Sequence, residues 1–198
     1  MAQTAARKRL TPDQRRADII RAADRMLAGR DASSVTFDEI AAAAGVSRAL
    51  VYNYFGDRGG LLAAVYSAAF AGLDDSVAAA LHASMPPRDR LHTVVERYVD
   101  FAQAHAGDWL SLGNLAASQH AAVRAAREHR HARLAALLGG GGESRLITAA
   151  LLGLLEGSIV EWVANPAMGR ERLVELLDDF TWSGIQGLLD DGVINVAD

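Results

Sequence analysis

Residues 35–55 read VTFDEIAAAAGVSRALVYNYF and contain two helix starts on either side of a glycine. Thr36 followed three residues later by Glu39 is the pattern of a capping box, which predicts that a helix begins here. Gly45 suits the end of that helix, because glycine adopts the left-handed conformation without a Cβ clash. Ser47 can then cap a second short helix. Two short helices joined by a tight glycine turn predict a helix-turn-helix, whose second helix enters the major groove of DNA.

The stretch resembles the DNA-binding region of the TetR family of bacterial transcriptional regulators. The resemblance implies an all-α fold, in which a three-helix domain over 11–70, with its helix-turn-helix at 36–55, binds DNA. A fourth helix joins it to a helical domain over 71–198 that binds an effector and forms a dimer. The residues that carry the resemblance are Thr36, Ile40, Ala41, Ala44, Gly45, Val46, Ser47, Tyr52, Tyr54 and Phe55, with Leu61 and Leu62 continuing the pattern.

The chain departs from the family's pattern in two places. The family usually has a Lys and an acidic residue after this Phe, whereas this chain has Asp57-Arg58-Gly59-Gly60. Arg58 keeps a positive charge for a phosphate contact. A glycine in a helix interior costs about 1 kcal/mol relative to alanine, so one hypothesis is that Gly59 and Gly60 let the DNA-binding domain pivot. The family often has Gly at Ala49, whose methyl can contact a thymine methyl.

Composition excludes several classes of protein. Hydrophobic residues make up 51% of the 198 residues, which is too many for a disordered chain. The absence of cysteine excludes disulfides and thiol chemistry and fits a reducing cytoplasm. No apolar run reaches the ~18–20 residues of a membrane span, and residues 1–10 lack the apolar core of a signal peptide. We therefore expect a cytoplasmic protein with no membrane partner.

Charge is distributed unevenly along the chain. Residues 1–60 hold ten Lys and Arg against seven Asp and Glu, a net +3, whereas residues 61–198 hold ten against seventeen, a net −7. A positive head on an acidic body directs DNA to one end of the molecule. Residues 1–10 carry a basic cluster, which we interpret as a disordered arm, either solvated or reaching the DNA backbone or minor groove.

Hydrophobic periodicity predicts nine helices. Thr11 and Gln14 form a second capping pair around Pro12, which favours the first helical position. The four glycines at 139–142 predict a linker rather than a helix. The predicted ranges are 11–28, 36–44, 47–55, 57–81, 88–106, 109–117, 119–138, 143–164 and 170–190.

The second helix of the motif offers the side chains that a DNA reader needs. Arg48 is the best candidate for base recognition because its fork fits guanine, and Ala49 and Asn53 are weaker candidates. Thr36 and Ser47 can alternatively serve only as helix caps, and Tyr52 can partly pack between helices. The expected phosphate contacts, which position a protein without reading sequence, are Thr36, Ser47, Tyr52, Tyr54 and Arg58.

The resemblance implies that a small ligand enters the body, moves the fourth helix and changes the spacing of two recognition helices. A ligand pocket is usually apolar with a few polar groups, so we expect a hydrophobic effector and no cofactor. The candidate lining residues, each of which can instead be core, are Tyr66, Phe70, Tyr98, Phe101, His105, Trp109 and Trp162.

The two long C-terminal helices carry apolar stripes too wide for one neighbour. They can form an ordinary hairpin within the chain or half of a four-helix interface between two copies. The resemblance favours a homodimer, because the family dimerises through its last two long helices. The candidate interface residues are Leu151, Leu155, Ile159, Trp162, Leu177, Phe180, Ile185 and Leu188.

Enzymatic function is the first alternative. The sequence has no glycine-rich phosphate loop, Gly-x-Ser-x-Gly turn or metal-binding motif. Adjacent residues point to different sides of a helix, so we interpret the acidic pairs at 74–75, 178–179 and 190–191 as solvated or helix-end charges. His129 and His131 are two residues apart and poorly placed to share a metal. We predict that the chain is not an enzyme and has no metal site. Zinc-responsive regulation is an alternative that would require His120 or His92 to lie near these histidines.

Two further alternatives keep the helix-turn-helix. One is an architectural DNA-binding protein without an effector, which predicts weak sequence discrimination and no dedicated pocket. The other is a helix-turn-helix used mainly for contact with proteins. Repression is the family default, and the sequence does not distinguish it from activation.

Overall fold

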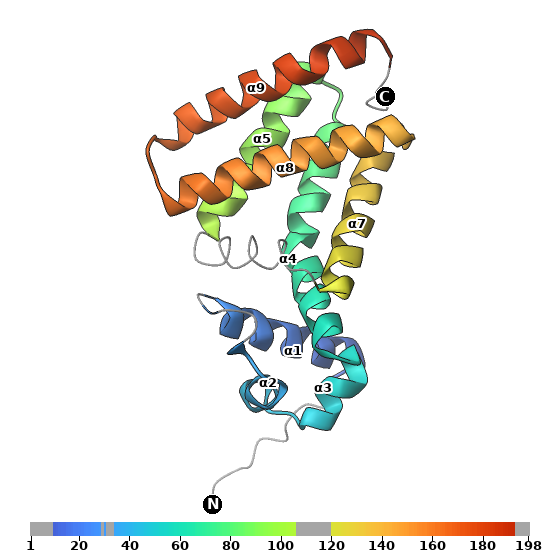
Figure 1. Cartoon of the computed structure of the whole chain (residues 1–198), viewed down its shortest axis with the longest axis vertical. Helices are drawn as coiled ribbons and strands as arrows, with labels where there is room; N and C mark the ends of the chain where they lie inside the picture. The colour runs from blue at the N-terminus through green and yellow to red at the C-terminus, as the bar shows by residue number, and fades with distance from the viewer. Residues whose placement is uncertain (1–9, 29, 31–33, 106–119, 193–198) are drawn as a thin grey trace, which may run out of the picture.

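The computed structural model describes residues 10–28, 30, 34–105 and 120–192, and these residues form eight α-helices without a strand (Figure 1). The predicted all-α class is therefore confirmed. The predicted helix over 109–117 and the basic arm, apart from Leu10, lie outside the described residues. The helices are α1 (Pro12–Leu27), α2 (Phe37–Ala44), α3 (Arg48–Phe55), α4 (Arg58–Leu81), α5 (Pro87–Ala104), α7 (Ala121–Ala136), α8 (Gly142–Ala164) and α9 (Arg170–Asp190).

Helices α1, α2 and α3 form a head at one end of the molecule (Figure 1). The predicted capping box of α1 is present, since the Gln14 amide donates to Thr11 Oγ1 at 3.2 Å and the Thr11 amide donates to Gln14 Oε1 at 3.0 Å. Ile19 of α1, Ile40 of α2 and Val51 of α3 are buried together in the core. These apolar contacts hold the two short helices of the motif at a defined angle.

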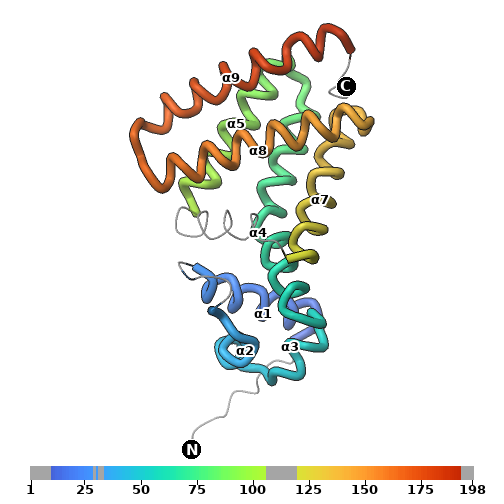
Figure 2. The backbone as a smooth tube through the Cα atoms, in the orientation of Figure 1, coloured from blue at the N-terminus to red at the C-terminus, as the bar shows by residue number. Residues whose placement is uncertain are grey.

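Helix α4 belongs to both parts of the molecule. Its first turns bury Leu61 and Leu62 in the same core as the head, and its last turns bury Val77 and Ala80 in the body. Figure 2 shows α4 running out of the head and then alongside α7 in the body. Helix α4 therefore connects the core of the head directly to the core of the body.

The body is a bundle of α4, α5, α7, α8 and α9. Helices α8 and α9 run antiparallel across the end farthest from the head, and both pack on α5 (Figure 1). Helices α4 and α8 are long and apolar enough to cross a membrane by length and composition, a test that core helices of soluble proteins also pass. In α8 only 22% of the most apolar stretch is buried within this chain.

Two expectations about the body are wrong. Gly142 is the first residue of α8 rather than part of the linker, while Gly139 and Gly140 adopt positive φ angles of 97° and 73°. Asp74 and Asp178 are only 4% and 7% exposed, so they are not solvated helix charges. The prediction failed because partners for a buried carboxylate come from helices far away in the sequence.

Candidate DNA-binding surface and ligand cavity

The turn of the motif is built from local hydrogen bonds. The Glu39 amide donates to Thr36 Oγ1 at 3.3 Å, and the Thr36 amide donates to Glu39 Oε2 at 2.8 Å, which completes the predicted capping box. Gly45 ends α2 with a φ of 64° in the left-handed region. Ser47 Oγ then accepts the Leu50 amide at 3.2 Å and caps α3. These bonds fix where α3 begins relative to α2.

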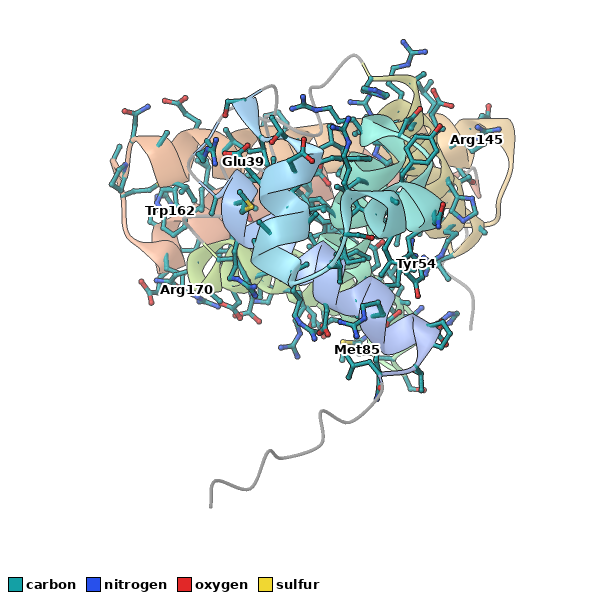
Figure 3. The ribbon with its side chains drawn as sticks, turned by 90° about the horizontal axis from the view of Figure 1, so that it is seen from below. Glu39, Tyr54, Met85, Arg145, Trp162 and Arg170 are labelled. Carbon is teal, nitrogen blue, oxygen red and sulfur yellow. The ribbon has the colours of Figure 1, made fainter. Side chains whose placement is uncertain are left out.

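One side of α3 packs inward and the other is open to solvent. Val51 and Phe55 are buried, whereas the predicted base-reading and phosphate-binding residues at the start and middle of the helix are exposed. Tyr52 is 61% exposed, so it does not pack between helices in this structure. Figure 3 views the molecule from the head and labels Tyr54 on α3 and Glu39 on the adjacent α2. The exposed residues of α3 and its cap are Ser47, Arg48, Ala49, Tyr52 and Asn53.

Arg48 has a partner that the sequence analysis missed. Its Nη1 donates to Asp38 Oδ2 of α2 at 2.9 Å, and both side chains are about two-thirds exposed, at 68% and 67%. The pair ties the candidate base-reading side chain to the first turn of the preceding helix. Because the residues are ten positions apart on different helices, no helical spacing rule could have paired them.

The other candidate phosphate contacts differ in their exposure and in the hydrogen bonds that they already make within the protein. The Thr36 hydroxyl donates to Glu39 Oε2 at 2.8 Å, so it is committed to the helix cap. Hydrogen bonds from the Thr36 backbone and side chain lower the pKa of Glu39 and keep it ionised. Tyr54 and Arg58 are half-buried at the edge of the head. Ser47 acts as an acceptor in its cap, which leaves its hydroxyl proton able to point at a phosphate.

The glycines at the start of α4 are sites of close approach. Asp57 Oδ1 caps the helix by accepting the Gly60 amide at 2.8 Å. A Cβ on Gly60 would lie 2.1 Å from the Phe55 carbonyl oxygen, and a Cβ on Gly59 would lie 1.8 Å from His120 Cε1 at the start of α7. The two glycines therefore let α3 and α7 come close to α4, an alternative to the pivot hypothesis.

The body contains an apolar cavity enclosed by α4, α5, α7, α8 and α9. Its wall includes Val77 of α4, Leu91 and Tyr98 of α5, Leu134 of α7 and Leu152 of α8. Of the seven predicted pocket residues, Tyr98 is a wall residue. The sequence analysis chose aromatic residues, whereas the wall is mainly aliphatic.

The remaining predicted pocket residues that the structure describes are not among those that line this cavity. Tyr66 and Phe70 are buried core, with ring centroids 4.9 Å apart. Phe101 is partly buried, and its ring lies 4.3 Å from that of exposed His105 in a tilted arrangement. Trp162 donates from Nε1 to the Met168 carbonyl at 2.8 Å. Trp109 lies outside the described residues.

A buried polar cluster adjoins this cavity behind Tyr98. Arg130 of α7 donates to Asp74 Oδ1 of α4 at 2.7 Å, to Glu156 Oε1 of α8 at 2.5 Å and to the Tyr98 hydroxyl at 2.6 Å. Its guanidinium also lies 4.1 Å from the Phe70 ring centroid, a cation–π contact. The cluster joins four helices, including the one that enters the head.

Burial sets the protonation behaviour of this cluster. Desolvation raises the pKa of both Asp74 and Glu156, although Arg130 opposes the rise. Burial also disfavours the Arg130 charge, but Tyr98, Glu156 and Asp74 outweigh that effect and raise its pKa. Among the described residues, no group of three or more histidines and carboxylates is arranged to hold a metal ion.

The predicted interface residues divide between the interior and the surface of the chain. Leu155, Ile159, Leu177 and Ile185 are at most 8% exposed and pack inside their own protomer. Phe180 is 65% exposed, and the residues with partial exposure are Leu151, Trp162 and Leu188. Surface apolar residues that the sequence analysis did not select are Leu146, at 73% exposed, and Leu176, at 44%.

Two known families match the sequence over these regions. Residues 19–65 match the bacterial regulatory proteins of the tetR family, and residues 87–184 match the tetracyclin repressor-like C-terminal domain. The first match includes the whole helix-turn-helix. The second extends from the start of α5 into α9.

Individual relatives agree with the family matches. The HTH-type transcriptional regulator BetI of Rhizobium meliloti is 35% identical over 100 residues, which is 49% of this chain and 49% of that protein. The HTH-type transcriptional activator FasR of Mycolicibacterium smegmatis is 27% identical over 192 residues, covering 89% of this chain and 85% of FasR.

Solved structures share the fold. A TetR-like transcriptional regulator from Rhodococcus sp. RHA1 is 28% identical with a TM-score of 0.67, covering 90% of this chain and 100% of that one. A tetR-family regulator from Streptomyces coelicolor is 25% identical with a TM-score of 0.64, covering 88% of this chain and 81% of that one.

Proposed function

Because this chain belongs to the TetR family of bacterial transcriptional regulators, we propose that it is a repressor that binds a pseudo-palindromic operator as a homodimer and is released by a small hydrophobic ligand. The observation that carries this proposal is the exposed polar face of α3, which begins at the Ser47 cap and is held by the buried Val51 and Phe55. A capped helix with a fixed direction and an open polar face suits the major groove. The site of action is the cytoplasm, where bacterial DNA is found.

Sequence recognition is assigned to Arg48, with Ala49 and Asn53 in support. Arginine binds the O6 and N7 atoms of guanine with two hydrogen bonds, and an alanine methyl can contact the thymine methyl. Ser47, Tyr52, Tyr54 and Arg58 are assigned to phosphates, which set the register without reading bases. The cap bonds of Thr36 argue for a structural role at that position, so its phosphate contact is the weakest of the set.

A homodimer is supported by apolar surface that the protomer leaves uncovered. Phe180 and Leu176 of α9 and Leu146 of α8 are exposed, and α8 has a mean hydropathy of 1.7 over a stretch that is only 22% buried. Exposed faces of this kind mark interaction surfaces. A symmetric dimer would place the centres of its two half-sites one helical turn apart, ~34 Å. We therefore propose that Leu146, Leu176 and Phe180, rather than the buried leucines, lie at the centre of the interface.

Release by a ligand is supported by the position of the cavity. Tyr98 forms part of the cavity wall, and its hydroxyl is bonded to Arg130, which is bonded to Asp74 of α4. A ligand that favours a different packing around Tyr98 would therefore act on the helix that leads to the DNA-binding head. Such a ligand changes DNA affinity only through different affinities for the two arrangements.

A gel-shift assay tests the proposal with the DNA that flanks the protein's own gene. We expect one retarded complex per palindrome, which is abolished by unlabelled operator and persists with scrambled DNA of the same composition. Equal binding of operator and scrambled DNA would instead support the architectural alternative. Transcription from the same promoter with and without the protein separates repression from activation, the function in the name of FasR.

A further inference from the structure

The cavity wall contains two threonines whose hydroxyl groups are engaged differently. Thr181 Oγ1 on α9 donates within its own helix, to the Leu177 carbonyl at 2.6 Å and with a longer contact of 3.1 Å to the Asp178 carbonyl. Thr148 on α8 is only 4% exposed, and its Oγ1 has no hydrogen-bond partner among the described residues. A buried hydroxyl without a partner is costly. Thr148 therefore marks the place where a bound molecule gains a hydrogen bond.

The other polar groups of the wall are occupied by the protein. Arg90 donates from Nε to the Met85 carbonyl at 2.8 Å and from Nη1 to the Leu81 carbonyl at 3.2 Å. The Tyr98 hydroxyl accepts from Arg130 at 2.6 Å. The rest of the lining is almost entirely aliphatic, from Val77 and Leu134 to Leu152. The wall therefore suits one polar group on an otherwise apolar molecule.

The charged groups next to Tyr98 argue against an acidic ligand group at that end of the cavity. Behind Tyr98, one guanidinium, that of Arg130, serves the two carboxyl groups of Asp74 and Glu156. A ligand carboxylate would bring a third acid toward this cluster and would lose its hydration against an aliphatic wall. The cavity extends along α5 from Pro87 to Tyr98, eleven residues that correspond to ~16 Å of helix. Lining residues therefore follow α5 for about three turns, which suits an elongated ligand.

We propose that this cavity binds an uncharged, elongated aliphatic molecule whose single polar group, a hydroxyl or a carbonyl, hydrogen-bonds Thr148 Oγ1. The proposal rests on the proposed function in one respect, namely that this molecule is the effector that releases DNA. Binding itself depends only on the body, so it is measured without DNA.

Three probes of equal chain length test the charge of the ligand by calorimetry. 1-Octanol, octanoate and octylammonium are titrated into the intact protein at neutral pH. We expect 1-octanol to bind at least about tenfold more tightly than either ion, because burying a charge in an aliphatic wall is unfavourable. Octanoate or octylammonium binding as tightly as 1-octanol, or no binding of any probe, overturns the proposal.

Two isosteric variants test the anchor. Thr148→Val removes the hydroxyl without a partner and should weaken 1-octanol binding about threefold to tenfold. Thr181→Val removes a hydroxyl already satisfied within its helix and should leave that affinity unchanged. Without ligand, Thr148→Val should keep or raise the Tm, whereas Thr181→Val should lower it. Equal effects of the two variants on affinity, or an equal fall in Tm, would show that Thr148 is not the anchor.

The link to regulation has a separate readout. A gel shift of the operator complex with increasing 1-octanol should show release in the wild type and weaker release in Thr148→Val. If 1-octanol binds through Thr148 but leaves the operator complex intact, the ligand site stands and ligand-induced release in the proposed function fails. If the protein binds no operator at all, the calorimetric result still decides the ligand site.

Discussion

In the head, the bonds that define α2 join residues three positions apart, such as Thr36 and Glu39. In the body, Arg130 joins residues that are 56, 32 and 26 positions away, in three other helices. The head is therefore specified by neighbours along the chain and keeps its polar face in solvent. The body is specified by distant partners and buries charge. This difference fits the proposed function, in which the head presents a prearranged reading surface and the body responds to a ligand.

The largest expected effect comes from replacing Arg130, which bonds to residues far away in the sequence. Arg130→Met leaves Asp74 and Glu156 buried without their guanidinium and should lower the free energy of unfolding by about 3–5 kcal/mol. Urea denaturation measures it. Arg170→Met is the matched control, because its pair with Asp100 is at the surface and should contribute less than about 1 kcal/mol. Equal losses in the two variants would contradict the contrast between buried and surface pairs.

The loss of unfolding free energy in Arg130→Met should also depend on pH. Burial raises the pKa of Asp74 and Glu156, and removing Arg130 takes away the strongest opposing effect, leaving only the weaker ones of Arg133 on Asp74 and Arg127 on Glu156. The folded variant therefore binds more protons than the unfolded chain, so its stability increases as the pH falls. Denaturation at pH 8 and pH 5 should show a smaller difference from the wild type at pH 5.

The next effect belongs to the surface of the head. Arg48→Ala should weaken operator binding by about 1–3 kcal/mol per half-site and relax sequence preference, because the bonds to guanine are lost. The free energy of unfolding should stay within about 0.5 kcal/mol of the wild type, since Arg48 is exposed. Titrating the variant with operator and with scrambled DNA measures both the loss of operator affinity and the loss of sequence preference. An equal loss on both DNAs would make Arg48 a phosphate contact.

A smaller effect is expected where the head meets the body. Gly60→Ala places a Cβ against the Phe55 backbone, which cannot rotate away, and should cost about 1–3 kcal/mol. Gly59→Ala meets only the His120 ring, so it should cost less and be rescued by adding His120→Ala. Thermal denaturation of the single and double variants measures this coupling. Equal costs without rescue would instead indicate that flexibility of α4 is what the glycines supply.

The smallest effect tests the partner of Arg48. Asp38→Asn removes a negative charge near the DNA and releases Arg48 from an exposed ion pair, which is worth about 0.2–1 kcal/mol. We expect slightly tighter binding to all DNA and a lower ratio of operator to scrambled affinity. Gel shifts at two salt concentrations separate the effect of the removed negative charge from the effect of releasing Arg48. An unchanged ratio would mean that Asp38 does not orient Arg48.

Prediction from sequence succeeded where the deciding contacts are local. The capping boxes at Thr11 and Thr36, the left-handed Gly45 and the cap at Ser47 were all predicted and are present. It failed for Asp74, whose partner lies 56 residues away. The cavity wall likewise depends on the packing of five helices, and of the aromatic residues proposed for a pocket, Tyr98 lies in this wall.

Sequence alone determined the all-α class, the helix-turn-helix with its caps and the family, because helix starts and ends are chosen by residues within one turn of each other. Tertiary structure decided which apolar residues remain exposed to solvent, so that Leu155 lies in the core while Phe180 lies at the surface. It also decided that Thr148 is buried without a partner and that Gly59 accommodates His120. Those outcomes depend on helices that are distant in sequence, and their side chains meet only after the bundle has packed.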